Sequence, residues 1–154
     1  MNIILHQPEI PPNTGNIARL CAGLDLSLHL IGPLGFSLED KHLRRAGLDY
    51  WPLVKLTVWP DWEAFLPSRP QGRLIAASAK AEDLFSAWIP RIDDNLLFGK
   101  ETAGLPPEIL RQADQALSVP LRPGVRSLNL ATTAGLFLGL ALASIPELAA
   151  GARP

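Results

Sequence analysis

The residues best suited to chemistry lie in three polar segments, each of which follows a short apolar run. The first segment, residues 8–19, contains Asn13 and Arg19. Asn13 or Thr14 could cap a helix that we expect to begin near Asn16, which would place Arg19 within about two turns of the positive helix end. A cation is disfavoured there. Arg19 therefore indicates either an anionic partner, such as a phosphate or a developing alkoxide, or a structural ion pair.

The second segment, residues 96–106, runs from an apolar stretch into a loop that contains two glycines and one carboxylate. Gly99 would let the backbone approach a ligand closely, and Gly104 could adopt a positive φ. Glu101 could contact a ligand or cap a turn. This pattern is typical of a ligand-binding loop at the end of a strand.

The third segment, residues 119–130, is a proline- and glycine-containing loop that leads into an apolar helix. Ser127 and Asn129 bring a hydroxyl and an amide to the start of that helix, where backbone N–H groups are free. The alternative is a well-capped buried helix, with Ser127 as the cap.

The elements that position these segments can be predicted from short apolar runs and helical spacing. Six strands are predicted: Asn2–His6, Leu28–Ile31, Leu53–Trp59, Arg73–Ser78, Asn95–Phe98 and Ala116–Val119. Helices are predicted between them at Asn16–Leu24, Leu38–Ala46, Asp61–Leu66, Pro106–Ala113 and Leu128–Ile145. This alternation favours an α/β fold, a mostly parallel sheet with helices on both faces, in which ligands bind beyond the carboxyl ends of the strands.

The length, composition and charge of the chain limit the classes of protein to which it can belong. The chain has 154 residues, 47% of them hydrophobic, which suits one folded domain over residues 1–154 and excludes disorder. A net charge of −1 excludes a polybasic protein that coats nucleic acid, but not a small basic face that meets one RNA. The single cysteine, Cys21, excludes a disulfide framework and a cysteine-built zinc site, so we expect a cytoplasmic protein without metal.

Two further features are expected to be structural. Residues 127–145 carry no charge, and we interpret them as a helix buried in protein rather than a membrane span. The histidines His6, His29 and His42 lie far apart in the sequence, which favours structural over catalytic roles.

In their order along the chain, the three segments resemble the motifs of the SPOUT superfamily of S-adenosylmethionine-dependent RNA methyltransferases. The motifs are N-x-x-N-x-x-R at residues 13–19, F-G-x-E-x-x-G-L at 98–105 and a proline followed by S-L-N at 120–129. The stretch 40–51, DKHLRRAGLDYW, is most similar to the small tRNA (cytidine/uridine-34) 2′-O-methyltransferases, which modify the wobble ribose of the anticodon loop. The resemblance covers essentially the whole chain.

That resemblance implies a C-terminal trefoil knot, which is rare because protein chains do not normally thread through their own loops. It also implies a homodimer whose active site takes residues from both subunits. Gly135 and Gly139 in the last helix would suit such an interface, or an internal contact. It implies S-adenosylmethionine as cofactor, with S-adenosylhomocysteine as product. Methylation of another tRNA or rRNA ribose, and a non-catalytic knotted RNA-binding module, remain as alternatives.

The resemblance also implies roles for individual residues. Arg19 would anchor a phosphate and stabilise the alkoxide, since guanidinium stays protonated, with Asn13 positioning nearby groups. Ser127 and Asn129 would place the cofactor and the reacting ribose. The cofactor walls would come from Ala77, Gly99, Val119, Leu121, Ser127 and Leu128, while Glu101 would order its loop or balance the sulfonium.

Contacts with RNA are expected from two basic groups, Lys41 with Arg44 and Arg45, and Arg122 with Arg126. The negative end of a helix would explain the first group almost as well. Tyr50 and Trp51 could stack on unpaired anticodon bases or belong to the core.

Overall fold

The computed structural model describes residues 1–39 and 50–150. The predicted helix Leu38–Ala46 falls almost wholly outside the described residues, as do His42, Lys41, Arg44 and Arg45. Leu38 and Glu39 form a turn.

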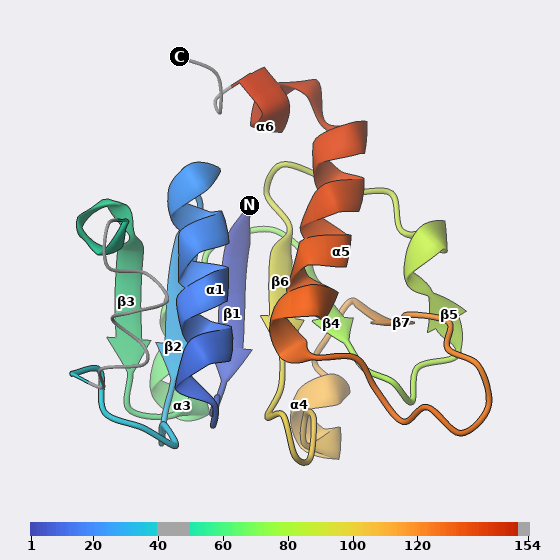
Figure 1. Cartoon of the computed structure of the whole chain (residues 1–154), viewed down its shortest axis with the longest axis horizontal. Coiled ribbons are helices and arrows are strands. Elements are labelled where there is room, and N and C mark those ends of the chain that lie inside the picture. Colours follow the sequence, from blue (N-terminus) through green and yellow to red (C-terminus); the bar gives the residue numbers. More distant parts are fainter. Residues whose placement is uncertain (40–49, 151–154) are drawn as a thin grey trace.

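One seven-stranded sheet organises the described part of the chain, in the order β3-β2-β1-β6-β4-β7-β5 (Figure 1). Its strands are Asn2–His6 (β1), Ser27–Ile31 (β2), Lys55–Trp59 (β3), Leu74–Ala77 (β4), Asp83–Leu84 (β5), Asn95–Phe98 (β6) and Gln115–Ser118 (β7). Every pairing is parallel. The predicted α/β sheet is therefore confirmed, and β5 was missed because two exposed residues leave no apolar run.

Helices cover both faces of the sheet. The two long helices, α1 (Pro11–Gly23) and α5 (Leu130–Ser144), lie side by side on one face (Figure 1). The short helices α3 (Trp62–Phe65) and α4 (Pro107–Leu110) pack on the other. A last helix, α6, spans Pro146–Ala150, and 3₁₀ turns occupy Trp51–Leu53, Leu66–Ser68 and Phe85–Ala87.

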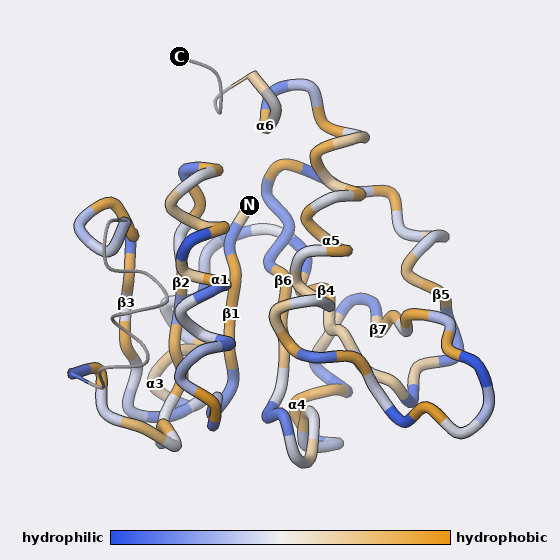
Figure 2. Tube along the Cα trace, viewed as in Figure 1, coloured by the Kyte–Doolittle hydropathy of each residue, from blue (hydrophilic) through white to orange (hydrophobic). Residues whose placement is uncertain are grey.

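Alternation along the buried strands supplies two cores. Ile3 and Leu5 of β1 face α1 and α5, whereas Ile4 faces α3 and α4. Because both faces of a parallel sheet are covered, the central strands carry continuous apolar runs after a polar first residue, IIL in β1 and LLF in β6, which Figure 2 shows in orange. The apolar run that predicted β1 is thus explained by burial on two sides.

Helix α1 begins earlier than predicted. It starts at Pro11, where a missing N–H costs little, and neither Asn13 nor Thr14 caps it. Arg19 is consequently the ninth of 13 helical residues. The inference that Arg19 sits close to the positive helix end is wrong, and it no longer bears on which partner this residue has.

Helix α5 is capped by Asn129 and not by Ser127. The Asn129 Oδ1 atom accepts from the backbone N–H groups of Ala131 and Thr132, at 2.9 and 3.2 Å. The helix ends before Pro146, as predicted. Its burial is one-sided, since Phe137 is fully buried and Leu136 is 38% exposed. Within residues 1–39 and 50–150, no helix is long and apolar enough to cross a membrane.

Candidate active site

A cavity of about 1130 Å³ opens at the carboxyl ends of the central strands. All three polar segments contribute to its wall, through Ile10, the loop 99–105 after β6 and the loop 119–129 after β7. In parallel sheets this edge is where ligands bind, because loops rather than strands meet there. The cavity lies at the position that the strand order predicts.

Each residue expected to contact a cofactor lines this cavity: Ala77, Gly99, Glu101, Val119, Leu121, Ser127 and Leu128. Asn129 and Arg126 line it as well. Among the described residues, Arg19 and Arg122 are not part of the lining, although both are exposed on the surface. Asn13 is buried directly behind the wall.

Three side chains from the three segments form one hydrogen-bonded chain. The Asn129 Nδ2 group donates to Asn13 Oδ1 at 2.7 Å, and Asn13 Nδ2 donates to Glu101 Oε1 at 2.9 Å. Asn13 therefore uses both ends of its amide. This chain fixes α1 and the start of α5 against the loop after β6.

The carboxylate of Glu101 also supplies the cap that α1 lacks. It accepts from the backbone N–H of Glu9 at 2.8 Å and from that of Ile10 at 3.2 Å. These are donors at the helix start that have no partner within the helix. Of the two predicted roles for Glu101, ordering its loop is directly visible.

Glu9 and Thr102 add hydrogen bonds between the same two segments, the residues before α1 and the loop after β6. Here the loop donates and the segment before α1 accepts. Glu9 Oε2 accepts from the Thr102 backbone N–H at 3.0 Å and from Thr102 Oγ1 at 2.7 Å. These bonds lower the pKa of the Glu9 carboxyl. No sequence pattern singled out Glu9, and Thr102 occupies a variable position of its motif. The two residues are 93 positions apart in the sequence and come into contact only in the folded chain.

Gly99 is required by the tight fold of its own loop. A Cβ atom at this position would lie 2.3 Å from the carbonyl carbon of Gly104. Gly104 has a φ of +72° and open space around it. The positive φ predicted at Gly104 is confirmed, while the close approach at Gly99 is to the loop's own backbone.

The negative charge of Glu101 has no cationic partner within the described part of the chain, where the ion pairs are Lys55–Asp25 and Arg73–Asp94. Its partners are two backbone N–H groups and one neutral amide. Such donors hold the carboxylate in place without neutralising it. Lys100 and Arg126 line the same cavity, but neither forms an ion pair with this carboxylate.

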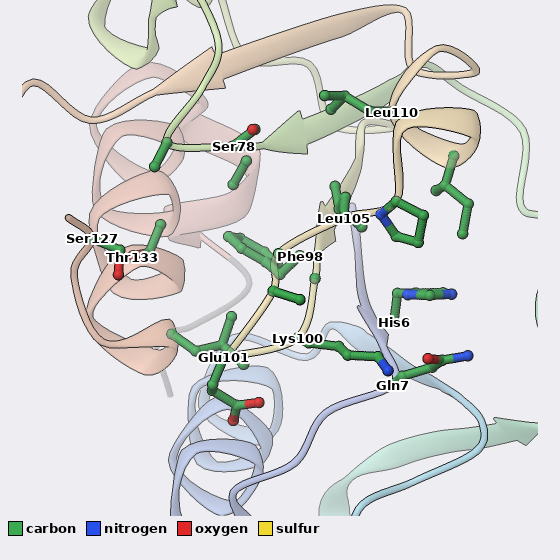
Figure 3. A pocket seen from close by; sticks show the side chains of 18 of the residues that line it. His6, Gln7, Ser78, Phe98, Lys100, Glu101, Leu105, Leu110, Ser127 and Thr133 are labelled. Carbon is green, nitrogen blue, oxygen red and sulfur yellow. The ribbon is translucent and has the colours of Figure 1, made fainter.

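A second arm of the cavity lies on the other side of the loop after β6. In Figure 3, His6, Gln7 and Lys100 lie on one side of this loop, opposite Ser127 and Thr133. His6 is buried and packs edge-on against Trp62, and burial followed by the charge of Lys100 lowers the pKa of its imidazole.

His29 and Cys21 have structural environments. His29 Nδ1 accepts from the indole N–H of Trp59 at 3.2 Å, and the two rings stack. Burial lowers the pKa of His29 and raises the pKa of the buried Cys21 thiol to about 12. A thiol with that pKa stays protonated and is a poor nucleophile.

Comparison with known proteins identifies the group to which this chain belongs. The model of the SpoU rRNA Methylase family matches residues 1–139. A tRNA (cytidine(34)-2′-O)-methyltransferase from Aeromonas hydrophila is 46% identical over 140 residues, which is 90% of each chain.

Two solved structures have the same fold. One, described as giving structural insights into the 2-OH methylation of C/U34 on tRNA, is 45% identical with a TM-score of 0.90 and covers 95% of this chain and 96% of its own. The SpoU methyltransferase AviRb from Streptomyces viridochromogenes, solved with AdoMet, has a TM-score of 0.83 at 21% identity, over 96% of this chain and 61% of its own. The chain therefore belongs to the SpoU rRNA methylase family.

Proposed function

We propose that the protein transfers a methyl group from S-adenosylmethionine to the ribose 2′-hydroxyl of nucleotide 34, a cytidine or uridine, in the tRNA anticodon loop. The observation that carries this proposal is the convergence of the three motif segments on one cavity, tied together by the chain Asn129–Asn13–Glu101. The wobble nucleotide is taken from the activity of the relative that is 46% identical.

The cavity fits the proposed cofactor. Val119, Leu121 and Leu128 offer apolar surface for an adenine, and the backbone N–H groups of Leu121 and Leu128 donate to no other described residue. S-adenosylmethionine supplies a methyl group bonded to a positively charged sulfur. Glu101, whose charge no described cation neutralises, is suited to a position near that charge.

The polar residues have separate tasks in this proposal. Asn13 and Asn129 hold the segments of the cavity wall in fixed positions relative to one another. The Ser127 hydroxyl contributes a hydrogen-bonding group to the lining. Arg19 anchors a phosphate and stabilises the ribose alkoxide, because a guanidinium remains protonated and cannot serve as the base at ordinary pH. Arg122 and Arg126, with Lys41, Arg44 and Arg45, contact the RNA backbone.

We further propose that two copies form the active enzyme. Arg19 is exposed and does not line the cavity of its own protomer, so a second copy would have to receive it. A Cβ atom at Gly135 or Gly139 would meet no described atom within 4 Å, which removes the alternative of a close internal contact. These two glycines therefore suit the surface of α5 that meets the partner.

The remaining proposals concern the chain as a whole. Residues 1–154 form one methyltransferase domain, because the cavity takes residues from both halves of the chain. Its C-terminal part is threaded as a trefoil knot by the loops after β6 and β7, which share the cavity wall. A protein that acts on tRNA works in the cytoplasm, and no metal is required for methyl transfer from a sulfonium.

Labelled methyl transfer to bulk tRNA, followed by mapping of the modified nucleoside, tests the proposal. We expect label at the 2′-oxygen of nucleotide 34; label at another ribose would change the substrate, and no transfer together with RNA binding would indicate a non-catalytic module. Arg19→Ala should abolish transfer while calorimetry still detects S-adenosylhomocysteine binding. Loss of that binding with transfer retained at saturation would overturn the role of Arg19.

A further inference from the structure

The guanidinium of Arg19 lies over the ring of Tyr50, with its central carbon 5.2 Å from the ring centroid. Arg19 is exposed on α1, and Tyr50 is 41% exposed, so the pair lies at the surface. A cation within about 6 Å of an aromatic ring is attracted to the negative ring face. The contact therefore favours one orientation of a long side chain that water would otherwise leave free.

Tyr50 is presented to α1 by an anchored turn. The Leu53 N–H donates to the Tyr50 carbonyl at 2.9 Å, and the Val54 N–H donates to the Trp51 carbonyl at 3.1 Å. This turn lies against α1, and Trp51 packs on the core beneath α1 and α5. The backbone from which the Tyr50 side chain extends is thus held in place by the packing of Trp51.

The structure decides against one of the two roles that the sequence left open for Tyr50. A ring that is 41% exposed does not belong to the core. One face of the ring is in contact with Arg19, and stacking of an RNA base stays a prediction for the other face. Trp51, in contrast, does pack against the core.

We propose that Tyr50 is a positioning residue for Arg19 and orders its guanidinium before RNA binds. The inference rests on the proposed function of Arg19. An arginine loses side-chain entropy when its guanidinium is held against the developing alkoxide, a contact that exists only in the transition state, and a ring that already restricts the side chain reduces that loss. The benefit appears in the methyl-transfer step, not in cofactor binding.

The test compares Tyr50→Leu with Tyr50→Phe. Loss of an exposed cation–π contact corresponds to about a two- to fivefold decrease in rate, which we expect in kcat for Tyr50→Leu. The KM for tRNA and the affinity for S-adenosylhomocysteine should stay unchanged. Tyr50→Phe keeps the ring and should restore kcat. Leu53→Ala, at a position that is 64% exposed in the same turn, is the matched control and should behave as wild type.

A second readout does not depend on activity. Nitrogen-15 relaxation of the Arg19 Nε–Hε group in the free protein should report more motion in Tyr50→Leu and unchanged motion in Tyr50→Phe. Unchanged motion in Tyr50→Leu overturns the proposal, as does a raised KM for tRNA at normal kcat, which would assign the ring to ground-state binding of the RNA.

The failure of this inference differs from the failure of the proposed function. If Arg19→Ala is inactive while Tyr50→Leu has wild-type kcat, only the positioning role fails. If Arg19→Ala keeps wild-type activity, the catalytic role of Arg19 fails, and the catalytic value of its contact with Tyr50 fails with it.

Discussion

Two hydrogen-bonded networks, each centred on one carboxylate, lie at the two ends of the central strand β6. We call these ends the amino edge, where the parallel strands begin, and the carboxyl edge, where they finish. At the amino edge, Asp94 precedes β6 and is fully buried. At the carboxyl edge, Glu101 follows the same strand and is partly exposed. The two carboxylates are thus separated by a single strand but lie in different electrostatic surroundings.

Asp94 is paired with a cation. Arg73 donates to both of its oxygens, at 2.8 and 2.7 Å, and the indole N–H of Trp88 adds a bond at 3.0 Å. A buried charge requires such pairing, because desolvation otherwise costs several kcal/mol. This network closes the amino edge and offers no free charge to a ligand.

Glu101 is held as firmly in geometry but only by neutral donors. Its charge remains available to the cavity that it lines. The comparison teaches that a carboxylate paired with an arginine is neutralised within the fold, whereas a carboxylate held by amides keeps its charge, which the proposed function uses for binding. Substitutions of Arg73 and Glu101 test this difference directly, and substitutions of Asn129 and of the α5 glycines test the elements beyond the two carboxylates.

The largest effect is expected from Arg73→Ala. It leaves the buried Asp94 carboxylate without its cation, and breaking a buried pair in this way costs about 3–5 kcal/mol of unfolding free energy. Urea unfolding measures the loss, and Arg73→Lys, which keeps a charge, should lose less. If folded Arg73→Ala binds S-adenosylhomocysteine more weakly than wild type does, the two edges are not independent.

Glu101→Gln removes the charge of Glu101 together with one hydrogen bond, because the glutamine amide nitrogen cannot accept from the Glu9 N–H, and the two ligands separate these two effects. We expect affinity for S-adenosylmethionine to fall about five- to tenfold more than affinity for S-adenosylhomocysteine, because only the former carries a positive sulfur. Calorimetry with both ligands measures the ratio. Glu9→Gln, in the neighbouring segment, is the matched control and should affect both ligands equally. Equal losses in Glu101→Gln would refute a role for its charge.

Asn129→Ser should separate the helix cap from the link to Asn13. Both Asn129→Ser and Asn129→Ala leave the buried Asn13 oxygen without its donor, but a serine oxygen can still cap α5, so the serine variant should be about 1 kcal/mol more stable to unfolding than the alanine variant. Serine is too short to replace the bond from Nδ2 to Asn13, and methyl transfer should fall about tenfold. Wild-type transfer in the folded serine variant would mean that the link is dispensable.

The smallest effect concerns α5, away from both carboxylates. Because no described atom lies within 4 Å of a Cβ at Gly135 or Gly139, alanine at either position should stabilise the separate protomer by up to about 1 kcal/mol through helix propensity. Sedimentation analysis should at the same time show weaker self-association. A protomer destabilised by either alanine would point to an internal contact instead.

Much of the fold could be predicted because burial on both faces of a parallel sheet leaves apolar runs in the sequence. The runs at β1 and β6 were placed correctly, since both strands lie in the centre of the sheet. Strand β3 was predicted two residues too long at its start, where Trp51–Leu53 forms a 3₁₀ turn. The edge strand β5 has no such signal, because its residues are exposed.

The sequence by itself determined the three motif segments and the parallel α/β class, since these depend on local residue type and on spacing along one chain, and the resemblance of those motifs to a known family implied the side chains that surround the cavity. Only the tertiary structure decided that Glu101 caps a helix 91 residues away and that Asn129, not Ser127, begins α5. It also placed Arg19 on the ring of Tyr50. A hydrogen bond or ring contact between distant segments depends on distances that the sheet sets after folding, and no local pattern encodes those distances.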